Sequence, residues 1–375
     1  MIPATTTSPR FPSFDSIEVV LWPGLALVAF VTSAVLVDLM IILAARFRLV
    51  DLPNRRSAHS LPTAHGGGVA IVVVTAVASL VVALRWPALA GRSLLGVVLP
   101  SLVIACVGMV DDIRPVRPAY RLVIQIVAAC WMTWVLGPLA RIGVPGAGTL
   151  DLGWVGWPLT VVWIVGMINA YNFMDGADGM AALAAVVVGA SMALIGLESS
   201  ALAVMLLAAI VAAASGGFLV FNWQPARVFM GDVGSGFLGL MFAGLSLLLD
   251  PSQRDRTFLP AILCLWPYVY DPFVSVLRRL WHGHNPLEPH REFLFHRLIR
   301  SGVSHASTAV LYAMLSIGGG LLGLAALEPT LSSGVRAAMP WGVVVMAVAL
   351  TIGVEGRCRR VGLASPTPVP DSDEQ

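Results

Sequence analysis

The sequence predicts an all-α integral membrane protein, a polytopic bundle of about eleven transmembrane helices. Of its 375 residues, 57% are hydrophobic and only 12% are charged, and the mean hydropathy is +0.84. Apolar stretches recur along the whole chain, which is typical of a protein that crosses the bilayer many times. The spans are expected to be helical, because lipid leaves the backbone of such a chain no other way to satisfy its hydrogen bonds. The lipid bilayer is therefore an expected partner, and nucleic acid is not.

The apolar stretches give the expected boundaries of the spans. Residues 19–45 form the first span, which is too long for a signal-peptide core. The remaining spans are expected at residues 67–84, 94–110, 121–137, 157–169, 180–197, 201–221, 236–249, 258–277, 306–327 and 338–355. The short span at 157–169 is expected to begin earlier. A mobile N-terminus (1–18), one membrane domain (19–356) and a disordered cytoplasmic tail (357–375) complete the predicted organisation.

The distribution of arginines predicts the orientation. All 23 basic residues are arginine, and with the N-terminus outside, sixteen of them fall in inside segments and seven in outside segments. This bias follows the positive-inside rule, so the C-terminus is expected in the cytoplasm. The four cysteines are isolated and mostly within apolar runs, which predicts packing residues, not disulfides or zinc ligands.

Five polar stretches interrupt the apolar pattern, and this orientation places all of them on the cytoplasmic side. They lie at about residues 46–66, 111–120, 169–179, 222–235 and 278–305. Five loops that converge on one face predict a single active site there. The outside segments, such as residues 137–156, contain no comparable group of polar residues.

The stretch 169–179 is the most informative of the five. It carries Asn169, Asn172, Asp175 and Asp178 at strict three-residue spacing. Residues three apart are neighbours on a helix, so we expect these side chains along one face of a helix end. The alternative is an ordinary polar loop. Polar groups next to hydrocarbon are costly, which favours a functional role.

Carboxylates, amides and glycines without cysteine are typical of a site for a hard cation. Mg²⁺ is expected, with Mn²⁺ as the alternative, held by few protein ligands together with substrate phosphates. Gly231, Gly234 and Gly236 surround Asp232 where a span begins. A glycine-rich turn at a helix N-terminus favours phosphate binding through its backbone N–H groups.

Asp111 and Asp112 are adjacent at the inner end of the third span. Neighbours on a helix point about 100° apart, so the two carboxylates are expected to have separate roles. The alternative is a solvated pair at the membrane edge that is balanced by Arg114 and Arg117.

Taken together, these motifs resemble those of the polyprenyl-phosphate N-acetylhexosamine-1-phosphate transferases, a glycosyltransferase family 4-type group. This group includes undecaprenyl-phosphate GlcNAc-1-phosphate transferases and the phospho-MurNAc-pentapeptide transferase. The resemblance covers about residues 51–305 and rests on four motifs in the correct order. They are Pro62-Thr-Ala-His-Gly-Gly-Gly68, Asp111-Asp112, Asn169-x-x-Asn172-x-x-Asp175-Gly-x-Asp178-Gly and Asn222-x-x-Pro225-Ala-Arg-x-Phe229-Met-Gly-Asp232-x-Gly-Ser235.

The resemblance implies a reaction and a location. The phosphate of undecaprenyl phosphate attacks the β-phosphate of a UDP-activated N-acetylated sugar, and UMP leaves. The protein is expected in the bacterial cytoplasmic (inner) membrane with its active site on the cytoplasmic face, and a homodimer is compatible with this. The implied catalytic residues are Asp111, which orients or deprotonates the lipid phosphate, Asp112, which supports it, and Asp232.

The resemblance also implies ligands. Mg²⁺ is expected at Asp232 and Asp175. The implied substrate-binding residues are His59, Asn172, Asp175, Asp178, Asn222, Arg227, Gly231, Ser235, His290, Arg291 and His296.

The fifth loop departs from the family pattern. Phe293 and Phe295 stand where the family has a dense histidine motif. This favours the branch that initiates O-antigen or capsule on sugars such as N-acetylfucosamine, N-acetylquinovosamine or GlcNAc, over the peptidoglycan enzyme. The two phenylalanines and Trp281 are expected to be interfacial anchors. Asp271 is expected either to line the lipid-phosphate groove or to pair with Arg278 or Arg279.

Two other function classes are compatible with parts of the pattern. A transporter or flippase for nucleotide sugars or lipid-linked sugars would place its polar groups near the bilayer midplane, often in repeated halves. Here they gather at one membrane edge. A catalytically inactive scaffold is expected to lose the carboxylates, and they are all present. Asp38, inside the first span, is expected to face a neighbouring helix.

Overall fold

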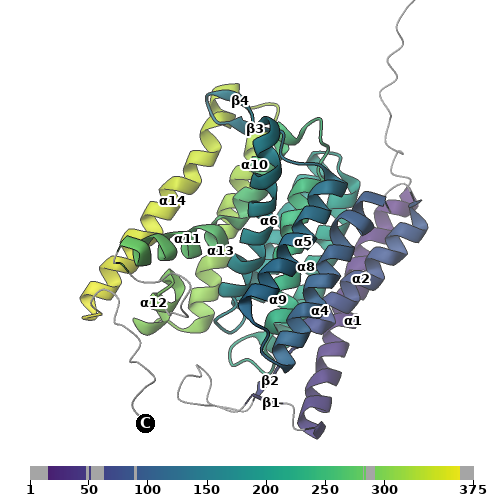
Figure 1. The fold of residues 1–375 in the computed structure, drawn as a ribbon, viewed down its shortest axis with the longest axis vertical. Coiled ribbons are helices and arrows are strands. Elements are labelled where there is room, and N and C mark those ends of the chain that lie inside the picture. The colour runs from purple at the N-terminus through teal and green to yellow at the C-terminus, as the bar shows by residue number, and fades with distance from the viewer. Residues whose placement is uncertain are drawn as a thin grey trace, which may run out of the picture.

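The computed structural model describes residues 16–47, 50–51, 63–87, 91–281, 283 and 292–363. It confirms the expected all-α membrane fold, because the described residues contain eleven helical segments long and apolar enough to cross a membrane. The helices lie side by side as one bundle (Figure 1). Only two short antiparallel strand pairs accompany them within the described residues, β1 (Val50–Asp51) with β2 (Thr63–Ala64), and β3 (Arg141–Val144) with β4 (Gly148–Asp151).

The helices follow the predicted order. They are α1 (Ser16–Phe47), α2 (Gly68–Arg85), α4 (Leu99–Ile113), α5 (Pro118–Leu136), α6 (Gly156–Phe173), α7 (Met180–Glu198), α8 (Leu202–Asn222), α9 (Gly231–Leu248), α10 (Arg254–Ile262), α11 (Trp266–Trp281), α12 (Leu294–Arg300), α13 (His305–Leu327) and α14 (Ser333–Arg360). A π-helical segment, η1 (Gly91–Val98), leads into α4, and 3-10 turns η2 (Gly153–Val155) and η3 (Leu263–Leu265) precede α6 and α11.

The expected earlier start of the short span is confirmed, because α6 begins at Gly156. Other boundaries differ from the expected ones. The ninth span is broken at η3 into α10 and α11, and α11 runs across the bundle at a steep angle to its neighbours (Figure 1). The helix α14 continues to Arg360. Arginines end a hydropathy pattern but not a helix, since they are good helix formers and suit the negative C-terminal end of its dipole.

The two ends of the bundle differ. One end, here called the site end, holds the Asp111–Asp112 pair, the α6–α7 loop and the start of α9. The other, the hairpin end, holds β3 and β4 (Figure 1). The hairpin was not predicted. Its pairing joins Arg141 to Asp151 and Val144 to Gly148 across a tight turn, in which Gly146 and Gly148 have φ of +81° and +88°.

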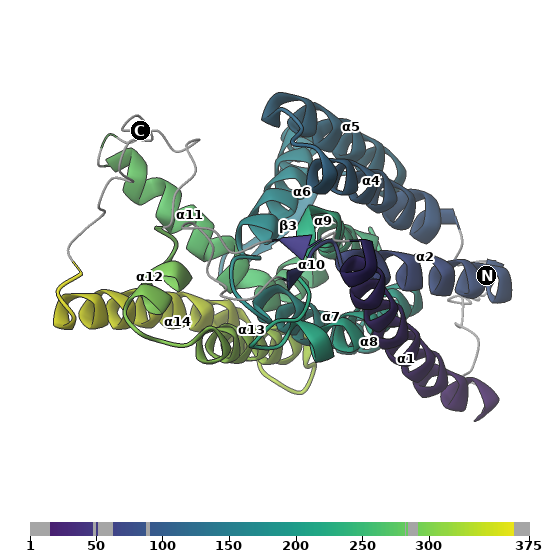
Figure 2. The ribbon, with the colours of Figure 1, turned by 90° about the horizontal axis from the view of Figure 1, so that it is seen from below.

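Helix α9 forms the centre of the molecule. Viewed from the site end, it lies between α4, α5 and α6 on one side and α7, α8 and α13 on the other (Figure 2). All but its Asp232 and its last residue are buried. Its glycines allow this, because small residues let neighbouring backbones approach closely. A Cβ on Gly239 would lie 2.6 Å from the carbonyl oxygen of Met167 in α6.

Helices α11, α12 and α14 form a lobe to one side of this core (Figure 2). Glu355 connects α14 to the other two helices of the lobe. It forms ion pairs with Arg278 of α11 (2.7 Å) and Arg297 of α12 (2.8 Å). Arg279 is paired with Glu292 at 3.2 Å. Arg278, Arg279 and Arg297 of the fifth stretch therefore hold the lobe together.

Candidate active site

The start of α9 is held by the carboxylate of Asp112. Its oxygens accept hydrogen bonds from the backbone N–H groups of Asp232 (2.8 Å) and Val233 (3.2 Å). Gly231 has φ +77°, and a Cβ there would lie 2.5 Å from Asp112 Oδ2. A glycine is required at this position, because any side chain would displace the capping carboxylate. His65 Nε2 lies 3.2 Å from the same carboxylate.

This cap occupies part of the glycine-rich turn that is expected to bind a phosphate. The sequence predicts that the N-terminus of α9 offers its N–H groups to a phosphate. Two of these groups are instead bound to Asp112, whose charge also meets the positive end of the helix dipole. Gly231 and Asp112 thus shape the start of α9, and contact of this turn with a substrate phosphate stays a prediction.

The glycines of the first polar stretch bring His65 to this place. The N–H groups of Gly67 and Gly68 donate to the carbonyl oxygens of Phe229 and Met230, both at 2.9 Å. The segment before α2 is thereby fastened to the loop that precedes α9. The described parts of four predicted loops meet at the site end, as predicted. They belong to the stretches 46–66, 111–120, 169–179 and 222–235.

Asp111 and Asp112 point to different partners, as their adjacency on a helix predicts. Asp111 accepts a hydrogen bond from the backbone N–H of Val116 at 2.5 Å and one from the guanidinium of Arg121. The same guanidinium nitrogen donates to Asp232 Oδ2 at 2.8 Å. Arg121, from the first turn of α5, thus bridges the carboxylates of α4 and α9.

Asn172 completes the surroundings of Asp232. Its Nδ2 donates to Asp232 Oδ1 at 2.8 Å and lies 2.9 Å from the Oγ of Ser235. A small cavity of about 30 Å³ adjoins these groups and is also lined by Asn169 and Gln125. These two amides bond to each other at 2.7 Å, through Asn169 Nδ2 and Gln125 Oε1.

The predicted single helix face of the 169–179 stretch is wrong. Helix α6 ends at Phe173, so Asn169 and Asn172 project from a helix, whereas Asp175 and Asp178 lie in the following loop. Three-residue spacing keeps side chains together only while the helix lasts. The glycines that follow Asp175 and Asp178 belong to this non-helical segment, and the second of them has φ +73°.

Asp178 and Asn222 hold loops together. Asp178 Oδ2 accepts a hydrogen bond from the N–H of Ala226 at 3.2 Å, and its Oδ1 lies 3.5 Å from His305 Nδ1. The buried Asn222 accepts from Gly179 N–H at 3.1 Å and donates to the carbonyl of Val228 at 2.8 Å. Both residues tie the α6–α7 loop to the α8–α9 loop. These contacts give both motif residues a role in holding the fold. Any contact of theirs with substrate stays a prediction.

The carboxylate of Asp175 is the least constrained of the group. Among the described residues, no donor forms a hydrogen bond with its side chain. Its pKa is raised from 3.8 to about 7, chiefly by burial and then by the nearby carboxylates of Asp232 and Asp112, against an opposing effect of His65. A carboxylate that is destabilised by neighbouring negative charge and lacks a donor is a suitable ligand for a cation.

The donor set fits Mg²⁺ held largely by its substrate. No group of three or more His, Cys, Asp or Glu within the described residues could enclose a metal ion by itself. Mg²⁺ commonly takes one or two carboxylates and completes its shell with water and phosphate oxygens. Asp175 and Asp232 are the two carboxylates that would hold it. Among the described residues, no donor forms a hydrogen bond with the Asp175 carboxylate, and Asp232 is held only by side chains.

His296 lies against the α6–α7 loop. A Cβ on Gly176 would lie 3.2 Å from its Nε2 and 2.8 Å from Phe295. Phe295 and Phe293 are buried, stack on each other at 5.9 Å, and Phe293 stacks on Phe173 of α6. The expectation that they are interfacial anchors is wrong, because both rings are buried and pack with each other and against α6. Trp281, 91% exposed, remains compatible with that role.

Asp271 fulfils neither of its expected roles. It is fully buried and accepts hydrogen bonds from the backbone N–H groups of Leu294 (2.6 Å) and Phe295 (3.1 Å) and from the Tyr312 hydroxyl (2.7 Å). Ser275 Oγ donates a fourth bond at 3.2 Å. Asp271 therefore joins α11, α12 and α13 and fixes the segment that carries His296.

Arg227 lies outside the carboxylate group. It is 60% exposed, stacks over Phe221 with 5.2 Å between its guanidinium carbon and the ring centre, and lies 3.9 Å from Asp38 of α1. Asp38 is half exposed and has this arginine as its neighbour. The predicted substrate contacts of His59, His290 and Arg291 fall outside the described residues.

Sequence reasoning did not place Arg121 and Gln125 in the site. Both project from α5, four residues apart and therefore on one helix face. A signal was present, since they are the polar residues in an otherwise apolar pattern at the inner end of a span.

This arrangement defines a class: a polytopic membrane protein with a carboxylate, amide and arginine cluster at one end of its bundle. Comparison with known proteins agrees with it. Residues 94–250 match the family described as glycosyl transferase family 4. The chain is 30% identical over 340 residues to the decaprenyl-phosphate N-acetylglucosaminephosphotransferase of Mycolicibacterium smegmatis, which covers 83% of each protein.

Two further relatives support the assignment. The chain is 29% identical over 289 residues to a probable undecaprenyl-phosphate N-acetylglucosaminyl 1-phosphate transferase of Bacillus subtilis, covering 76% of this chain and 80% of the relative. It is 39% identical over 170 residues to a phospho-N-acetylmuramoyl-pentapeptide-transferase of a Synechococcus species, covering 42% and 48%. The chain belongs to the polyprenyl-phosphate N-acetylhexosamine-1-phosphate transferase family.

Proposed function

We propose that the protein transfers an N-acetylated sugar-1-phosphate from a UDP-sugar to undecaprenyl phosphate. The products are undecaprenyl-diphosphate-sugar and UMP, and the step initiates a cell-surface glycan such as O-antigen or capsule. The observation that carries this proposal is the cluster of Asp111, Arg121, Asn172 and Asp232, with Asp175 beside it, at one end of a membrane bundle. A relative named for this kind of transfer matches 83% of the chain.

The chemistry requires little covalent participation from the protein. An oxygen of the lipid phosphate attacks the β-phosphorus of the UDP-sugar, the bond to the bridging oxygen breaks, and UMP leaves with the electron pair. Positioning and charge stabilisation dominate such transfers. A lipid phosphate is already mostly ionised near neutral pH. We therefore assign Asp111 mainly to orienting the attacking group.

The remaining residues of the cluster take the following roles. Mg²⁺, when bound, would neutralise charge on the diphosphate, and Asp175 and Asp232 are the residues that would hold it. Asn172 keeps Asp232 oriented through the 2.8 Å hydrogen bond. Arg121 presents a guanidinium suited to phosphate oxygens. Asp112 acts through the backbone that it caps, and His296 is placed to meet the sugar or its phosphate.

The location follows from the same chemistry. UDP-sugars are made in the cytoplasm, so the site end would face that side of the bacterial inner membrane. This agrees with the arginine distribution, which places the same loops inside. The relatives that match most of the chain are named for N-acetylglucosamine, and UDP-GlcNAc is therefore the first sugar to test.

Release of UMP by the purified protein in detergent tests the proposal. The assay combines undecaprenyl phosphate and Mg²⁺ with UDP-GlcNAc and, separately, the UDP forms of N-acetylquinovosamine, N-acetylfucosamine and MurNAc-pentapeptide. We expect release with at least one of the first three sugars, dependent on both lipid and metal. Asp232→Asn should abolish it. Asp151→Asn, on the exposed hairpin strand β4, is the matched control and should not.

The opposite result has a clear meaning. If no sugar releases UMP although the protein still binds a UDP-sugar, the transferase proposal is wrong. A transporter or a scaffold would then be the better account.

A further inference from the structure

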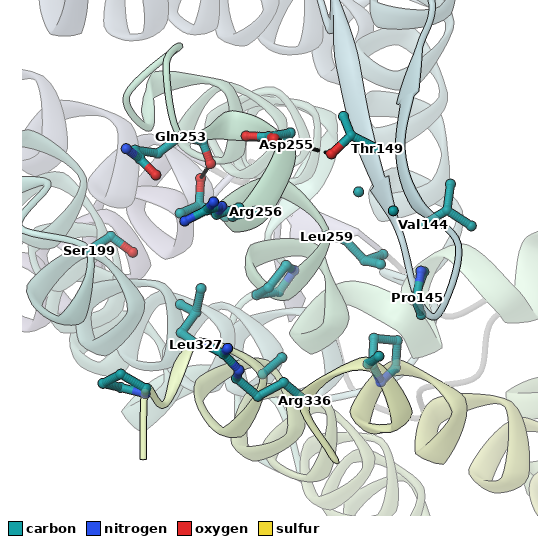
Figure 3. Close-up of a pocket in the computed structure, with 18 of the residues that line it drawn as sticks. Val144, Pro145, Thr149, Ser199, Gln253, Asp255, Arg256, Leu259, Leu327 and Arg336 are labelled. Atoms are coloured by element: carbon teal, nitrogen blue, oxygen red, sulfur yellow. Dashed lines mark hydrogen bonds between the residues drawn. The ribbon is translucent and has the colours of Figure 1, made fainter. Parts of the chain in front are cut away.

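The hairpin end contains a large cavity that is separate from the carboxylate cluster. Its volume is about 770 Å³, within the range of small-molecule sites. It is bordered by the β3–β4 hairpin, the start of α10 and the facing ends of α7, α13 and α14, and it is open to the surface. Figure 3 shows the side chains of these elements around it.

The position of the cavity is at the level of lipid headgroups. Four membrane-spanning segments begin or end at its wall, with termini at Glu198, Arg254, Leu327 and Ser333. Span ends mark the boundary between hydrocarbon and headgroups. Part of the lining is apolar, including Leu259, Leu327 and several prolines. The cavity therefore offers both the polar and the apolar surroundings that an amphiphilic ligand needs.

Two arginines line the cavity without an ion-pair partner among the described residues. Arg256 comes from α10 and Arg336 from α14, and Figure 3 shows them on the same side of the cavity with Leu327 between them. Neither forms a salt bridge or a side-chain hydrogen bond within the described part of the chain. Each lies in the first turns of its helix, where the helix dipole adds partial positive charge.

Two carboxylates also line the cavity. Asp255 is 3.4 Å from the hydroxyl of Thr149, and Glu198 is exposed at the end of α7. Two positive and two negative side chains give a cavity without net charge. A free multivalent anion gains less from such a lining than a headgroup that carries both a phosphate and an amine.

We propose that this cavity binds the phosphate-bearing headgroup of a membrane lipid. The phosphodiester would meet Arg256 and Arg336, since guanidinium groups match phosphate oxygens. An ethanolamine ammonium would meet Glu198 and Asp255. The site lies at the opposite end of the bundle from the carboxylate cluster and does not depend on the proposed reaction.

Native mass spectrometry of the delipidated full-length protein tests the proposal. Phosphatidylethanolamine, phosphatidylglycerol, diacylglycerol and inorganic phosphate are titrated separately. We expect both phospholipids to bind more tightly than diacylglycerol, with phosphatidylethanolamine the tightest. The double variant R256Q/R336Q should weaken phospholipid binding about ten-fold or more. Arg141→Gln, an exposed arginine on the same hairpin outside the cavity, is the matched control and should leave it unchanged.

A second variant keeps the charges and fills the space. Ala337→Trp places a large ring among the lining residues and should lower phospholipid binding as the double variant does. Inorganic phosphate that binds in an arginine-dependent way, while the lipids do not, would assign the phosphate site to a free anion. Diacylglycerol binding as tightly as the phospholipids, or equal effects of R256Q/R336Q and Arg141→Gln, would overturn the proposal. Thermal unfolding of each variant confirms that it is folded.

Discussion

Two groups of carboxylates share the site end and differ in what holds them. Asp112, Asp178 and Asp271 each accept hydrogen bonds from backbone N–H groups of another segment. Asp232 meets only side chains, and Asp175 meets no donor among the described residues. The first group is committed to holding helices and loops in place. The second group is held less tightly and can bind a cation.

One motif can therefore contain both a carboxylate that holds the fold and a carboxylate that is available to a ligand. Asp175 and Asp178 stand three residues apart in one loop, yet one faces the cluster and the other fastens the α8–α9 loop. Substitution should therefore separate them. Residues of the first group should change stability, whereas Asp175 and Asp232 should change metal binding and turnover with little change in stability.

The largest effect is expected at Asp232. Asp232→Asn keeps the shape of the side chain but removes the charge that Arg121 meets at 2.8 Å. We expect turnover to fall by about 10³-fold or more, because charge stabilisation dominates phosphoryl transfer. UMP release under saturating substrates measures it. An Asp232→Asn variant with near wild-type turnover would remove this residue from the chemistry.

The next comparison sets Asp175→Asn against Asp112→Asn. Asp112→Asn should lower the free energy of unfolding by about 1–3 kcal/mol, because the start of α9 loses a charged cap. Asp175→Asn should lower turnover by about 10²-fold and leave stability unchanged or slightly higher. Thermal unfolding and UMP release on the same preparations separate the two effects. Equal loss of stability in both variants would contradict the assignment of a structural role to Asp112 and a metal-binding role to Asp175.

Asp271→Asn tests whether a distant carboxylate positions the His296 segment. All of its hydrogen-bond partners are donors, and an asparagine can accept through one oxygen only, so α12 should loosen. We expect unfolding to become easier by about 1–3 kcal/mol and the KM for the UDP-sugar to rise more than kcat falls. Tyr312→Phe removes one donor and should show a smaller change in the same direction. An unchanged KM in both variants would leave Asp271 a purely structural residue.

The smallest effect concerns pH. The pKa of Asp175 is about 7 in the folded protein, above its ordinary value of 3.8, chiefly because of burial. Between these values the folded state binds more protons than the unfolded state, so stability from this group is present at low pH and is lost as pH rises through 7. The metal-free protein, kept in EDTA, should therefore lose stability over that window, and Asp175→Asn should flatten the slope. A slope that is equal in both proteins would rule out this carboxylate as its source.

Much of the fold could be predicted from the sequence. Hydropathy found all eleven spans, because a helix that crosses lipid must be apolar over about 20 residues. It could not show the break at Leu263–Leu265, since both halves are apolar, nor the hairpin, whose strands are short and solvent-exposed. Both features depend on tertiary packing.

The site was predicted as a set of residues but not as a geometry. Spacing identified Asp175 and Asp178 together, while the end of α6 at Phe173 sends them to different partners. Gly231 was expected to free backbone N–H groups, and it instead makes room for Asp112. Phe293 and Phe295 were expected at the interface because that is the commonest role of aromatic residues near a span. Which donors a carboxylate meets is a long-range property that local patterns do not contain.

The most direct test of which carboxylates hold the metal ion is the binding of Mn²⁺. Electron paramagnetic resonance measures this binding in the presence of UDP, whose diphosphate supplies further oxygens. We predict a bound ion in the wild-type protein, its loss in Asp175→Asn and Asp232→Asn, and its retention in Asp178→Asn. Mn²⁺ bound equally by all four proteins, or lost only in Asp178→Asn, would contradict the assignment of Asp175 and Asp232 as the ligands.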